Sequence, residues 1–394
     1  MWIWLETYTI LMKNVLIVSQ VIPQWYVDTL RNALGKDTCI DIITGSAVAG
    51  CNVIPSPPHD ARSFRSRLIC WIRHYRFVKQ WAKKNQHRHY DLIFAVSNPP
   101  INAAIGLKLK QQFNAPFVYM NWDLYPQVIE YGIRNVVGQT VGRVWHSWNN
   151  RNYQKIDRML TIGQVMAETI NARLKRKIKV DVIPIAVDTS RLRPIEKTDN
   201  PFAIEHHLTD KFVVLYSGKM GVGHNIELIL SASRLLKAHT DIQFVFIGNG
   251  PKYDTVKRFI EENNAKNILL LPFQSEEVFP YSMAGGDVGI VSQEASMAHL
   301  FMPSKTYSMM ACGEAIIGIS SAHDDLKLLI ESENIGFCVT DANPETLANA
   351  IIKLYKEPKL MVKFKRNARL TAESKFSVDI IQNEYTKLFE KLIS

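Results

Sequence analysis

Short apolar runs alternate along the chain with longer stretches in which apolar residues recur every three or four positions. The short runs predict buried strands, the longer stretches predict helices, and their alternation is typical of parallel sheets covered by helices. In the first half, strands are predicted at residues 14–19, 39–45, 90–97, 116–122, 158–163 and 179–185. In the second half, they are predicted at residues 212–218, 242–248, 267–273, 288–292, 315–320 and 336–340, with helices such as 226–238 and 252–264 between them.

A polar segment punctuated by prolines, near residues 189–208, separates the two strand series and predicts a linker. A chain of 394 residues is long enough for two domains with a core each. The predicted fold class is therefore α/β, with two doubly wound domains. Ligands of such sheets bind at the carboxyl ends of the strands, which here predicts a site in a cleft between the domains.

Composition indicates a globular protein whose two halves differ in charge. The chain is 47% hydrophobic and 21% charged, and none of its apolar runs is long enough to span a bilayer. Residues 1–200 carry 27 Lys and Arg against 14 Asp and Glu, whereas residues 201–394 carry 20 against 23, so one half is expected to face something anionic. The five cysteines form no CxxC pair, which predicts reduced thiols in a cytosol. The apolar start lacks the features of a signal peptide, and residues 1–11 are interpreted as an extension before Met12.

The segment YSGKMGVGHNIE combines the end of a predicted strand, a glycine turn and the start of a predicted helix. Gly218, Gly221 and Gly223 permit positive φ angles and close backbone approach. Lys219, and in addition His224, would bring positive charge to a helix N-terminus, which already favours an anion. The alternative interpretation is an ordinary glycine-rich turn, since the spacing matches neither a Walker loop nor a strict GxGxxG.

Two further segments sit at equivalent places in the pattern. In IGNGPK, Gly248 and Gly250 can line a ligand or simply form a tight turn. In MPSKTYSMMACG, Ser304 is a plausible helix N-cap and Lys305 lies in the first helical turn. A lysine there opposes the helix dipole unless an anion compensates it, which favours a phosphate partner over a mere cap.

Residues 61–90 contain nine basic residues and no acid, with apolar residues at helical spacing. One interpretation is a helix with a core-facing stripe and a solvated basic back. The other is a helix on an anionic membrane surface, with tryptophan at headgroup depth. Nucleic acid is the less supported partner, because no nucleic-acid motif accompanies the charge. The residues assigned to the membrane contact are Arg65, Arg67, Trp71, Arg73, Arg76 and Lys79.

The order of these motifs resembles the family 4 glycosyltransferases, and in particular the branch that builds bacterial O-antigen, capsule and exopolysaccharide. The resemblance is carried by YSGKMGVGHNIELIL, IQFVFIGNGP, LPFQSEEVFPYSMAGGDVGIV and MPSKTYSMMACGEAIIG, and more loosely by MKNVLIVSQ, YDLIFAVSNPP, NWDLYPQ and VIPIAVD. It implies a GT-B fold of two Rossmann-like domains facing each other across a cleft. Residues 1–190 would bind the acceptor, residues 209–375 would bind the nucleotide sugar, and residues 376–394 would form a helix returning to the first domain.

The resemblance also implies roles for single residues. Lys219 stands where the family places a phosphate-binding base, His224 stands where a lysine is more usual, and Phe273 resembles the main-chain contact to the nucleotide base. Ser304 and Lys305 are then candidates to complete the phosphate site. Transfer is expected to retain configuration and to need no metal or other cofactor, with a nucleotide sugar, most simply a UDP-sugar, as co-substrate.

The chain departs from the family pattern at two acidic positions. The two glutamates of the family's Glu-x7-Glu pair would fall at Leu300 and Ser308, so Glu294 is a candidate replacement for the first, and Ser308 keeps a weaker hydrogen bond to the ribose. A second departure, Glu314-Ala315, stands where a proline commonly follows.

On the acceptor side, the first loop is replaced by a segment containing Gln24, Trp25 and Tyr26, which suit sugar binding, although a buried Trp fits equally well. Asp123 is the acceptor-side carboxylate, with a helix N-cap as the alternative.

Two functions follow from these expectations. The first is a glycosyltransferase that uses a lipid-linked or glycan acceptor, located in the cytoplasm and peripheral at the inner face of the cell membrane. The second is a catalytically silent GT-B protein that binds a nucleotide sugar or a partner enzyme, which the two missing glutamates motivate.

Overall fold

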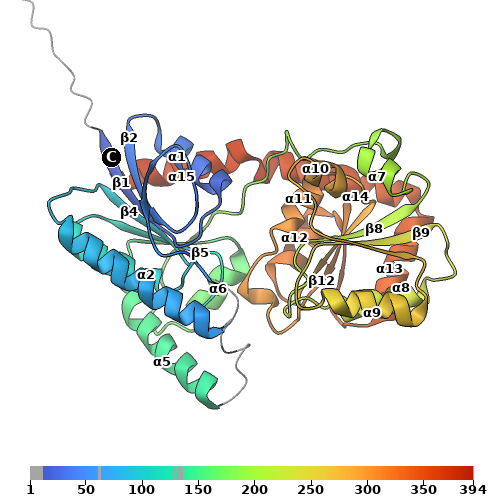
Figure 1. The fold of residues 1–394 in the computed structure, drawn as a ribbon, viewed down its shortest axis with the longest axis horizontal. Coiled ribbons are helices and arrows are strands. Elements are labelled where there is room, and N and C mark those ends of the chain that lie inside the picture. Colours follow the sequence, from blue (N-terminus) through green and yellow to red (C-terminus); the bar gives the residue numbers. More distant parts are fainter. Residues whose placement is uncertain (1–11, 61–63, 128–129, 131–135, 394) are drawn as a thin grey trace, which may run out of the picture. The chain divides into compact units, whose positions relative to one another are not determined.

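The computed structural model describes residues 12–60, 64–127, 130 and 136–393 (Figure 1). The proposed extension over residues 1–11 lies outside this part of the chain. The contacts divide the chain into two compact units, each built around one parallel sheet. The first unit comprises Met1–Ile162, Ile170–Ile183 and Ile381–Ser394, and the second comprises Gly163–Thr169 and Pro184–Ile380. The predicted α/β class with two parallel-sheet domains is confirmed.

The first unit contains a seven-stranded parallel sheet in the order β3-β2-β1-β4-β5-β6-β7. The strand order reverses between β1 and β4, which is the switch point where ligands of doubly wound sheets bind. The sequence pattern missed β3, a short strand at the sheet edge. The strands are β1 (Lys13–Val18), β2 (Thr38–Thr44), β3 (Asn52–Pro55), β4 (Leu92–Val96), β5 (Phe117–Asn121), β6 (Arg158–Thr161) and β7 (Val180–Val182).

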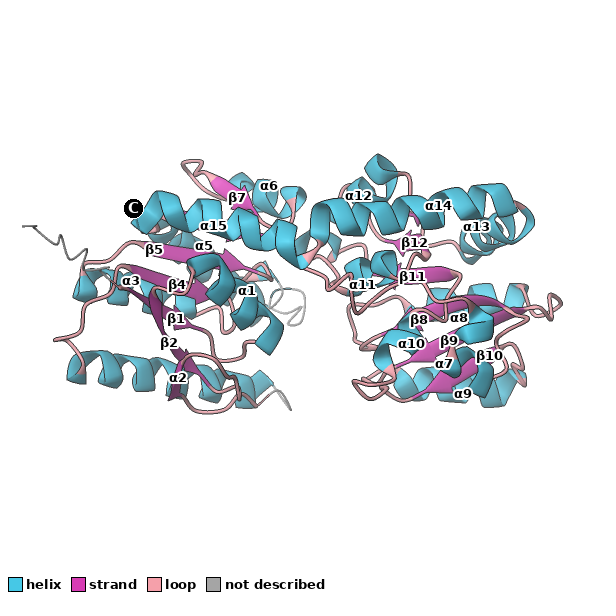
Figure 2. Cartoon of the chain, turned by 90° about the horizontal axis from the view of Figure 1, so that it is seen from above, coloured by secondary structure: helices cyan, strands magenta, loops and turns pink. Residues whose placement is uncertain are grey.

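Helices cover both faces of this sheet (Figures 1 and 2). The C-terminal helix packs on the first unit, where the hydroxyl groups of Tyr26 and Tyr385 lie 2.7 Å apart in a buried contact. The helices are α1 (Gln24–Leu34), α2 (Phe64–Lys84), α3 (Asn102–Phe113), α5 (Val136–Asn152) and most of α15 (Val378–Ile393), with a 3-10 turn at Tyr153–Lys155. Helix α6 (Gln164–Ala172) begins in the second unit and ends in the first.

The second unit contains a six-stranded parallel sheet in the order β10-β9-β8-β11-β12-β13, with its switch point between β8 and β11. Every residue of β11 and β12 is buried, because central strands of a parallel sheet are covered on both faces. This burial explains why continuous apolar runs predicted these strands well. The strands are β8 (Phe212–Ser217), β9 (Ile242–Ile247), β10 (Ile268–Leu271), β11 (Val288–Ser292), β12 (Ala315–Ile319) and β13 (Gly336–Val339).

Helices again lie on both faces of the sheet (Figure 2). The predicted linker is not free chain. It contains a 3-10 turn and α7, and the Arg369 guanidinium donates hydrogen bonds to the carbonyls of Thr189, Leu192 and Ala311. The helices are α7 (Pro201–Glu205), α8 (Ile226–Leu235), α9 (Tyr253–Asn263), α10 (Phe279–Met283), α11 (Lys305–Ala311), α12 (Asp325–Glu333), α13 (Pro344–Lys356) and α14 (Pro358–Thr371), with 3-10 turns at Lys197–Asp199 and Ala298–Leu300 and a π-helical segment at Ala372–Phe376.

Candidate functional site

Two glycine turns meet at the carboxyl ends of β8 and β9 in the second unit. Gly218, Gly248 and Gly250 adopt φ angles of 132°, 144° and 133°, which side chains disfavour. A Cβ atom on Gly248 would lie 2.0 Å from the carbonyl oxygen of Gly218, so the two turns can pack this closely only with glycine. The backbone N–H of Met220 donates to the carbonyl of Asn249 at 2.7 Å and joins the turns. The predicted glycine residues are therefore brought together at one edge of the sheet.

Lys305 reaches into this edge from α11. A Cβ atom on Gly218 would lie 3.0 Å from Lys305 Nζ, so the ammonium sits directly beneath the glycine turn. Although the residue as a whole is partly exposed, Nζ is buried and has no hydrogen-bond partner among the described residues. Burial lowers the pKa of Lys305 to about 7, because desolvation disfavours the charged form. A buried ammonium without a partner is suited to an anionic ligand.

Lys219 and Phe273 lie at the same edge but remain exposed. Lys219 occupies the turn between Gly218 and Met220, with its side chain open to solvent. Phe273 follows β10 and is 50% exposed, and a Cβ atom on Gly248 would lie 3.4 Å from its ring. These two predicted residues therefore border the glycine turns and are accessible to a ligand.

His224 lies at the site, but it carries no positive charge there. Its Nδ1–H donates to the carbonyl of Ser292 at 2.5 Å. Burial, with a smaller contribution from the nearby Lys305 charge, lowers the pKa of His224 to about 4. The expectation that His224 supplies positive charge is wrong at neutral pH, because the ring is neutral.

Lys252 is a site residue that the sequence interpretation did not assign. Its Nζ donates to the carbonyl of His224 and to Glu227, both at 2.7 Å, and lies 3.7 Å from the Glu294 carboxylate. The backbone N–H of Glu294 donates to the carbonyl of Gly223 at 2.9 Å. Glu294 is thus held beside the glycine turn, where a carboxylate was expected. The only signal for Lys252 was its place after the glycine pair in IGNGPK.

The remaining predicted residues of α11 behave differently. Ser304 adopts helical backbone angles and its side chain makes no capping hydrogen bond, so the expectation of a side-chain N-cap is wrong. Ser308 is partly buried on α11, and Leu300 is 2% exposed.

Glu314 does not replace the missing glutamate at position 308. It is fully buried, and its carboxylate packs against Gly286 and Gly289 at the opposite, amino-terminal end of β11. Burial raises the pKa of Glu314 well above its ordinary value. Glu314 therefore does not supply the carboxylate that the family pattern places at position 308.

The predicted acceptor residues divide into two groups in the first unit. Trp25 is 44% exposed and stacks on Trp122, with 6.5 Å between the ring centroids. Gln24 is exposed and donates to Asp28 at 3.0 Å. Tyr26 is 3% exposed and bonded to Tyr385, so its assignment to sugar binding is wrong and it belongs to the core.

Asp123 follows β5 at the carboxyl end of the first sheet. It lies in a bend, where its backbone N–H faces Ser97 Oγ at 3.4 Å. Burial raises the pKa of Asp123 to about 6. Its carboxylate is therefore largely ionised at neutral pH and can accept a proton near that range.

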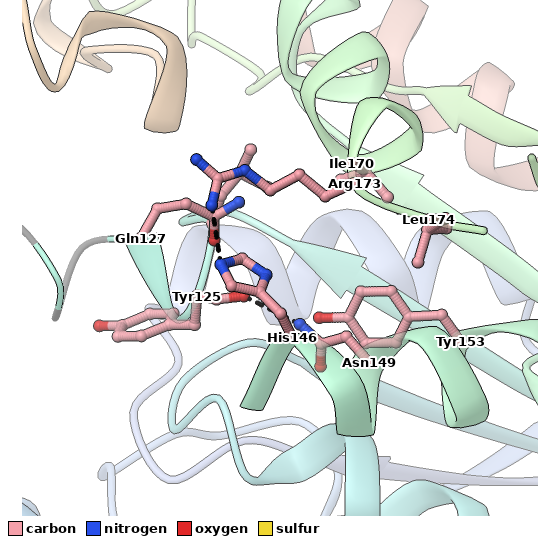
Figure 3. A pocket seen from close by; sticks show the side chains of 9 residues that line it. Tyr125, Gln127, His146, Asn149, Tyr153, Ile170, Arg173 and Leu174 are labelled. Atoms are coloured by element: carbon pink, nitrogen blue, oxygen red, sulfur yellow. Dashed lines mark hydrogen bonds between the residues drawn. The ribbon is translucent and has the colours of Figure 1, made fainter. Parts of the chain in front are cut away.

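A small cavity in the first unit was not expected from the sequence (Figure 3). Its volume is about 20 Å³, close to the room one water needs, and the buried amide oxygens of Gln127 and Asn149 border it without a hydrogen-bond partner among the described residues. At its rim, Arg173 Nη1 lies 2.8 Å from His146 Nε2. The cavity fits an internal water and is too small for a sugar.

The basic helix predicted near residues 61–90 is α2, with one correction. Trp71 is 6% exposed and packs edge-on against Tyr125 at 6.2 Å, so it cannot lie at headgroup depth. Its assignment to the membrane contact is wrong, and the core-facing interpretation holds for this side chain. The other assigned residues, Arg65, Arg67, Arg73, Arg76 and Lys79, are exposed.

Comparisons with known proteins follow the same two-unit division. A model of "Glycosyltransferase Family 4" matches residues 31–191, and a model of "Glycosyl transferases group 1" matches residues 198–371. The probable glycosyltransferase WbjE of Pseudomonas aeruginosa is 24% identical over 67% of this chain and 66% of its own length. The putative colanic acid biosynthesis glycosyl transferase WcaI of Escherichia coli is 23% identical over 56% of this chain and 55% of its own length. The chain thus spans just under two thirds and about half of these relatives.

The fold has a close counterpart among solved structures. The crystal structure of Anabaena HepE in complex with UDP matches with a TM-score of 0.73 and 16% identity, covering 96% of this chain and 100% of that one. Two parallel α/β sheets with this likeness define a GT-B protein. The two family models together cover most of the chain, and the protein belongs to the family 4 glycosyltransferases.

Proposed function

We propose that this protein transfers a sugar from a nucleoside diphosphate sugar, most simply a UDP-sugar, to a lipid-linked or glycan acceptor in the synthesis of a bacterial surface polysaccharide. The observation that carries the proposal is the buried ammonium of Lys305 beneath the Gly218 turn, which has no hydrogen-bond partner in the part of the chain that the structure describes. The names of WbjE and WcaI and the UDP bound to HepE support the reaction class and the donor. Retention of configuration and independence of a metal are part of the proposal and rest on the family resemblance.

The chemistry follows from the charges at the second sheet. When the bond between the sugar carbon and the diphosphate oxygen breaks, negative charge develops on the leaving diphosphate. Lys305 and the exposed Lys219 would stabilise that charge. Stabilisation of charge that develops in the transition state is usually the largest single contribution to catalysis. Glu294 and Ser308 would contact the sugar or ribose hydroxyls. In the first unit, Asp123 would orient the acceptor hydroxyl or accept its proton.

A direct test mixes the full chain with a UDP-sugar and a lipid-linked acceptor and measures released UDP. We expect release with the wild-type protein and its loss in Lys305→Ala, while Lys356→Ala on α13 serves as a surface control.

The alternative is a silent GT-B protein, which the serine at position 308 favours. Tight nucleotide binding without turnover over a broad panel of donors and acceptors, unchanged by Ser308→Glu, would establish the alternative.

The membrane contact is a separate part of the proposal. None of the described helices is both long and apolar enough to cross a bilayer. On α2, the exposed basic residues accompany the aliphatic side chains of Leu68, Ile69 and Ile72, which are 45%, 50% and 40% exposed. Such a face suits an anionic bilayer, where the cations meet headgroups and the aliphatic groups enter the interface. This would place the protein at the inner face of the cell membrane.

Vesicle cosedimentation tests this contact. We expect binding to anionic vesicles and not to neutral ones, with strong weakening in the double variant Arg73→Glu/Arg76→Glu. A matched variant, Lys363→Glu/Arg366→Glu on α14, controls for net charge. Equal binding to both kinds of vesicle would rule out the electrostatic contact.

A further inference from the structure

Tyr216 lies near the end of β8, directly beneath the glycine turn of the second unit. It is 1% exposed, its ring packs at a tilt on Phe246 with 5.8 Å between centroids, and the His224 ring meets it edge-on at 6.3 Å. A side chain buried in this way would ordinarily belong to the core alone. Tyr216 differs because both of its chemical groups contact the two lysines of the site.

The ring of Tyr216 faces one lysine and its hydroxyl holds the other. Lys305 Nζ lies 3.8 Å from the ring centroid, within the range of a close cation–π contact. The Tyr216 hydroxyl donates to the backbone carbonyl of Lys219 at 2.9 Å. One side chain therefore contacts both lysines that the proposed mechanism uses, Lys305 at its ammonium and Lys219 at its main chain.

The ring is the compensating contact that the structure offers the buried ammonium. Lys305 Nζ has no hydrogen-bond partner among the described residues, so the charged form depends on the negative face of an aromatic ring. An aliphatic residue of similar size at position 216 would fill the space without offering that attraction. The hydroxyl acts separately, since it fixes the carbonyl that determines where the Lys219 side chain leaves the turn.

We propose that Tyr216 is the positioning residue of the diphosphate site: its ring holds Lys305 Nζ beneath the Gly218 turn, and its hydroxyl holds the main chain of Lys219. The assignment of the ligand rests on the proposed function, whereas the contact between the ring and Lys305 does not. Tyr216 touches no reacting atom in this scheme and acts through the two lysines.

A consequence is that nucleotide binding takes up a proton. The pKa of Lys305 is lowered to about 7 by burial, so a large part of the free protein carries a neutral amine at pH 7.5. The groups around it are Tyr216 from β8, the neutral His224 and the exposed Lys219 in the following turn, and Lys252 behind His224. None of them supplies a negative charge. A diphosphate does so, which restores the proton to Lys305.

The experiment has an arm without ligand and an arm with UDP. Without ligand, the 13Cε signal of Lys305, assigned by its loss in Lys305→Met, is titrated by NMR in the labelled full chain. We expect a midpoint near that of the wild type in Tyr216→Phe, which keeps the ring, and a midpoint about one pH unit lower in Tyr216→Leu. With UDP, calorimetry in two buffers of different ionisation enthalpy should show proton uptake that persists to lower pH in Tyr216→Leu and is absent in Lys305→Met.

UDP affinity separates the two contacts of Tyr216. We expect a loss of about threefold in Tyr216→Phe, from the missing hydroxyl, and of about tenfold or more in Tyr216→Leu. If Tyr216→Leu fails to fold, 3,4,5-trifluorophenylalanine at position 216 weakens the ring's negative face with little change in its size. Because it also lacks the hydroxyl, it is compared with Tyr216→Phe, and the same replacement of Phe246 is the control.

An unchanged Lys305 midpoint in Tyr216→Leu or in the fluorinated variant would overturn the proposal. The wild-type protein could also fail to bind UDP while the Lys305 midpoint is lowered in Tyr216→Leu and unchanged in Tyr216→Phe. That result would overturn the donor assignment and support the positioning role of Tyr216.

Discussion

The carboxyl-terminal edges of the two sheets occupy equivalent places in similar folds and present opposite chemistry. At the switch point of the second sheet, glycine turns expose backbone, and the buried Lys305 ammonium has no hydrogen-bond partner among the described residues. At the switch point of the first sheet, Trp25 stacks on Trp122, and a partly buried carboxylate, Asp123, follows the next strand. The first arrangement suits an anion and the second suits the hydroxyl groups and apolar faces of a sugar.

The difference shows that one architecture can supply a cationic or a carboxylate site according to what its strand-end loops carry. A glycine loop brings backbone close to a phosphate, whereas an aromatic loop provides a flat apolar surface. If the comparison is right, changes at the second sheet alter donor affinity, and changes at the first sheet alter acceptor use alone. The following variants test this separation in order of expected effect.

Lys305→Met should have the largest effect on activity. Removal of a cation that stabilises developing charge should lower kcat/KM by about 10²–10³-fold.

The same variant should raise the melting temperature at pH 7. The pKa of Lys305 in the folded protein, about 7, lies below its ordinary value of 10.5, so the protonated form is disfavoured by folding. The loss of folding stability that Lys305 causes is therefore complete below about pH 7. It disappears as the pH rises towards 10.5, the ordinary pKa of lysine. Thermal melts from pH 6 to pH 9 measure it, and a variant less stable than the wild type at pH 6 contradicts the burial of an unpaired charge.

Asp123→Asn should lower kcat by about 10²-fold and leave UDP affinity unchanged, since the carboxylate lies in the other unit. The wild-type kcat/KM should fall as pH drops through about 6, where Asp123 is protonated, and fall again above about 7, where Lys305 loses its proton. The optimum should lie between these values. In Asp123→Asn the acid limb should disappear and the alkaline limb should remain. Weaker UDP binding in this variant would show that the two edges do not act separately.

How much of this site follows from sequence depends on the kind of information involved. The glycine turns could be predicted, because Gly218 and Gly248 stand at the ends of apolar strands and only glycine fits their backbone. Twelve strands were predicted, and the central ones were clearest because buried parallel strands are continuous apolar runs. The edge strand β3 was missed because its four residues are partly or fully exposed and carry no such run.

Burial of single side chains could not be predicted. Surface or charged roles were predicted for Trp71, His224 and Tyr26. In the structure Trp71 and Tyr26 are buried in the core, and burial keeps the His224 ring neutral. The contact between Tyr216 and Lys305 joins residues far apart in the chain, and no spacing rule connects them. Sequence therefore located the edge of the sheet, whereas the electrostatic state of its groups required the structure.

Gly248→Ala tests the close approach of the two turns. The new Cβ atom would lie 2.0 Å from the Gly218 carbonyl oxygen at a φ of 144°, so the turn must shift. We expect a loss of about 2 kcal/mol or more in the free energy of unfolding, with weaker UDP binding. Gly35→Ala is the matched control, because Gly35 has a φ of +83° but nothing within 4 Å of the new atom. It should cost about 1–3 kcal/mol from conformation alone, less than Gly248→Ala, and leave UDP binding unchanged. Equal losses from both variants, measured by urea unfolding, would argue against the packing of the turns.

Trp25→Ala should have the smallest effect and tests whether the aromatic surface of the first unit serves the acceptor. The indole ring is 44% exposed and stacked on Trp122, so its removal leaves the core intact. Loss of one stacking surface for a sugar is worth about 1 kcal/mol, which corresponds to a rise of about fivefold in the acceptor KM with little change in kcat. Trp25→Phe, which keeps an aromatic ring, should recover most of that affinity. UDP affinity should stay constant in both variants because Trp25 belongs to the other unit. If the acceptor KM is unchanged, Trp25 and Trp122 are ordinary surface packing, and the acceptor is not bound through the Trp25 ring.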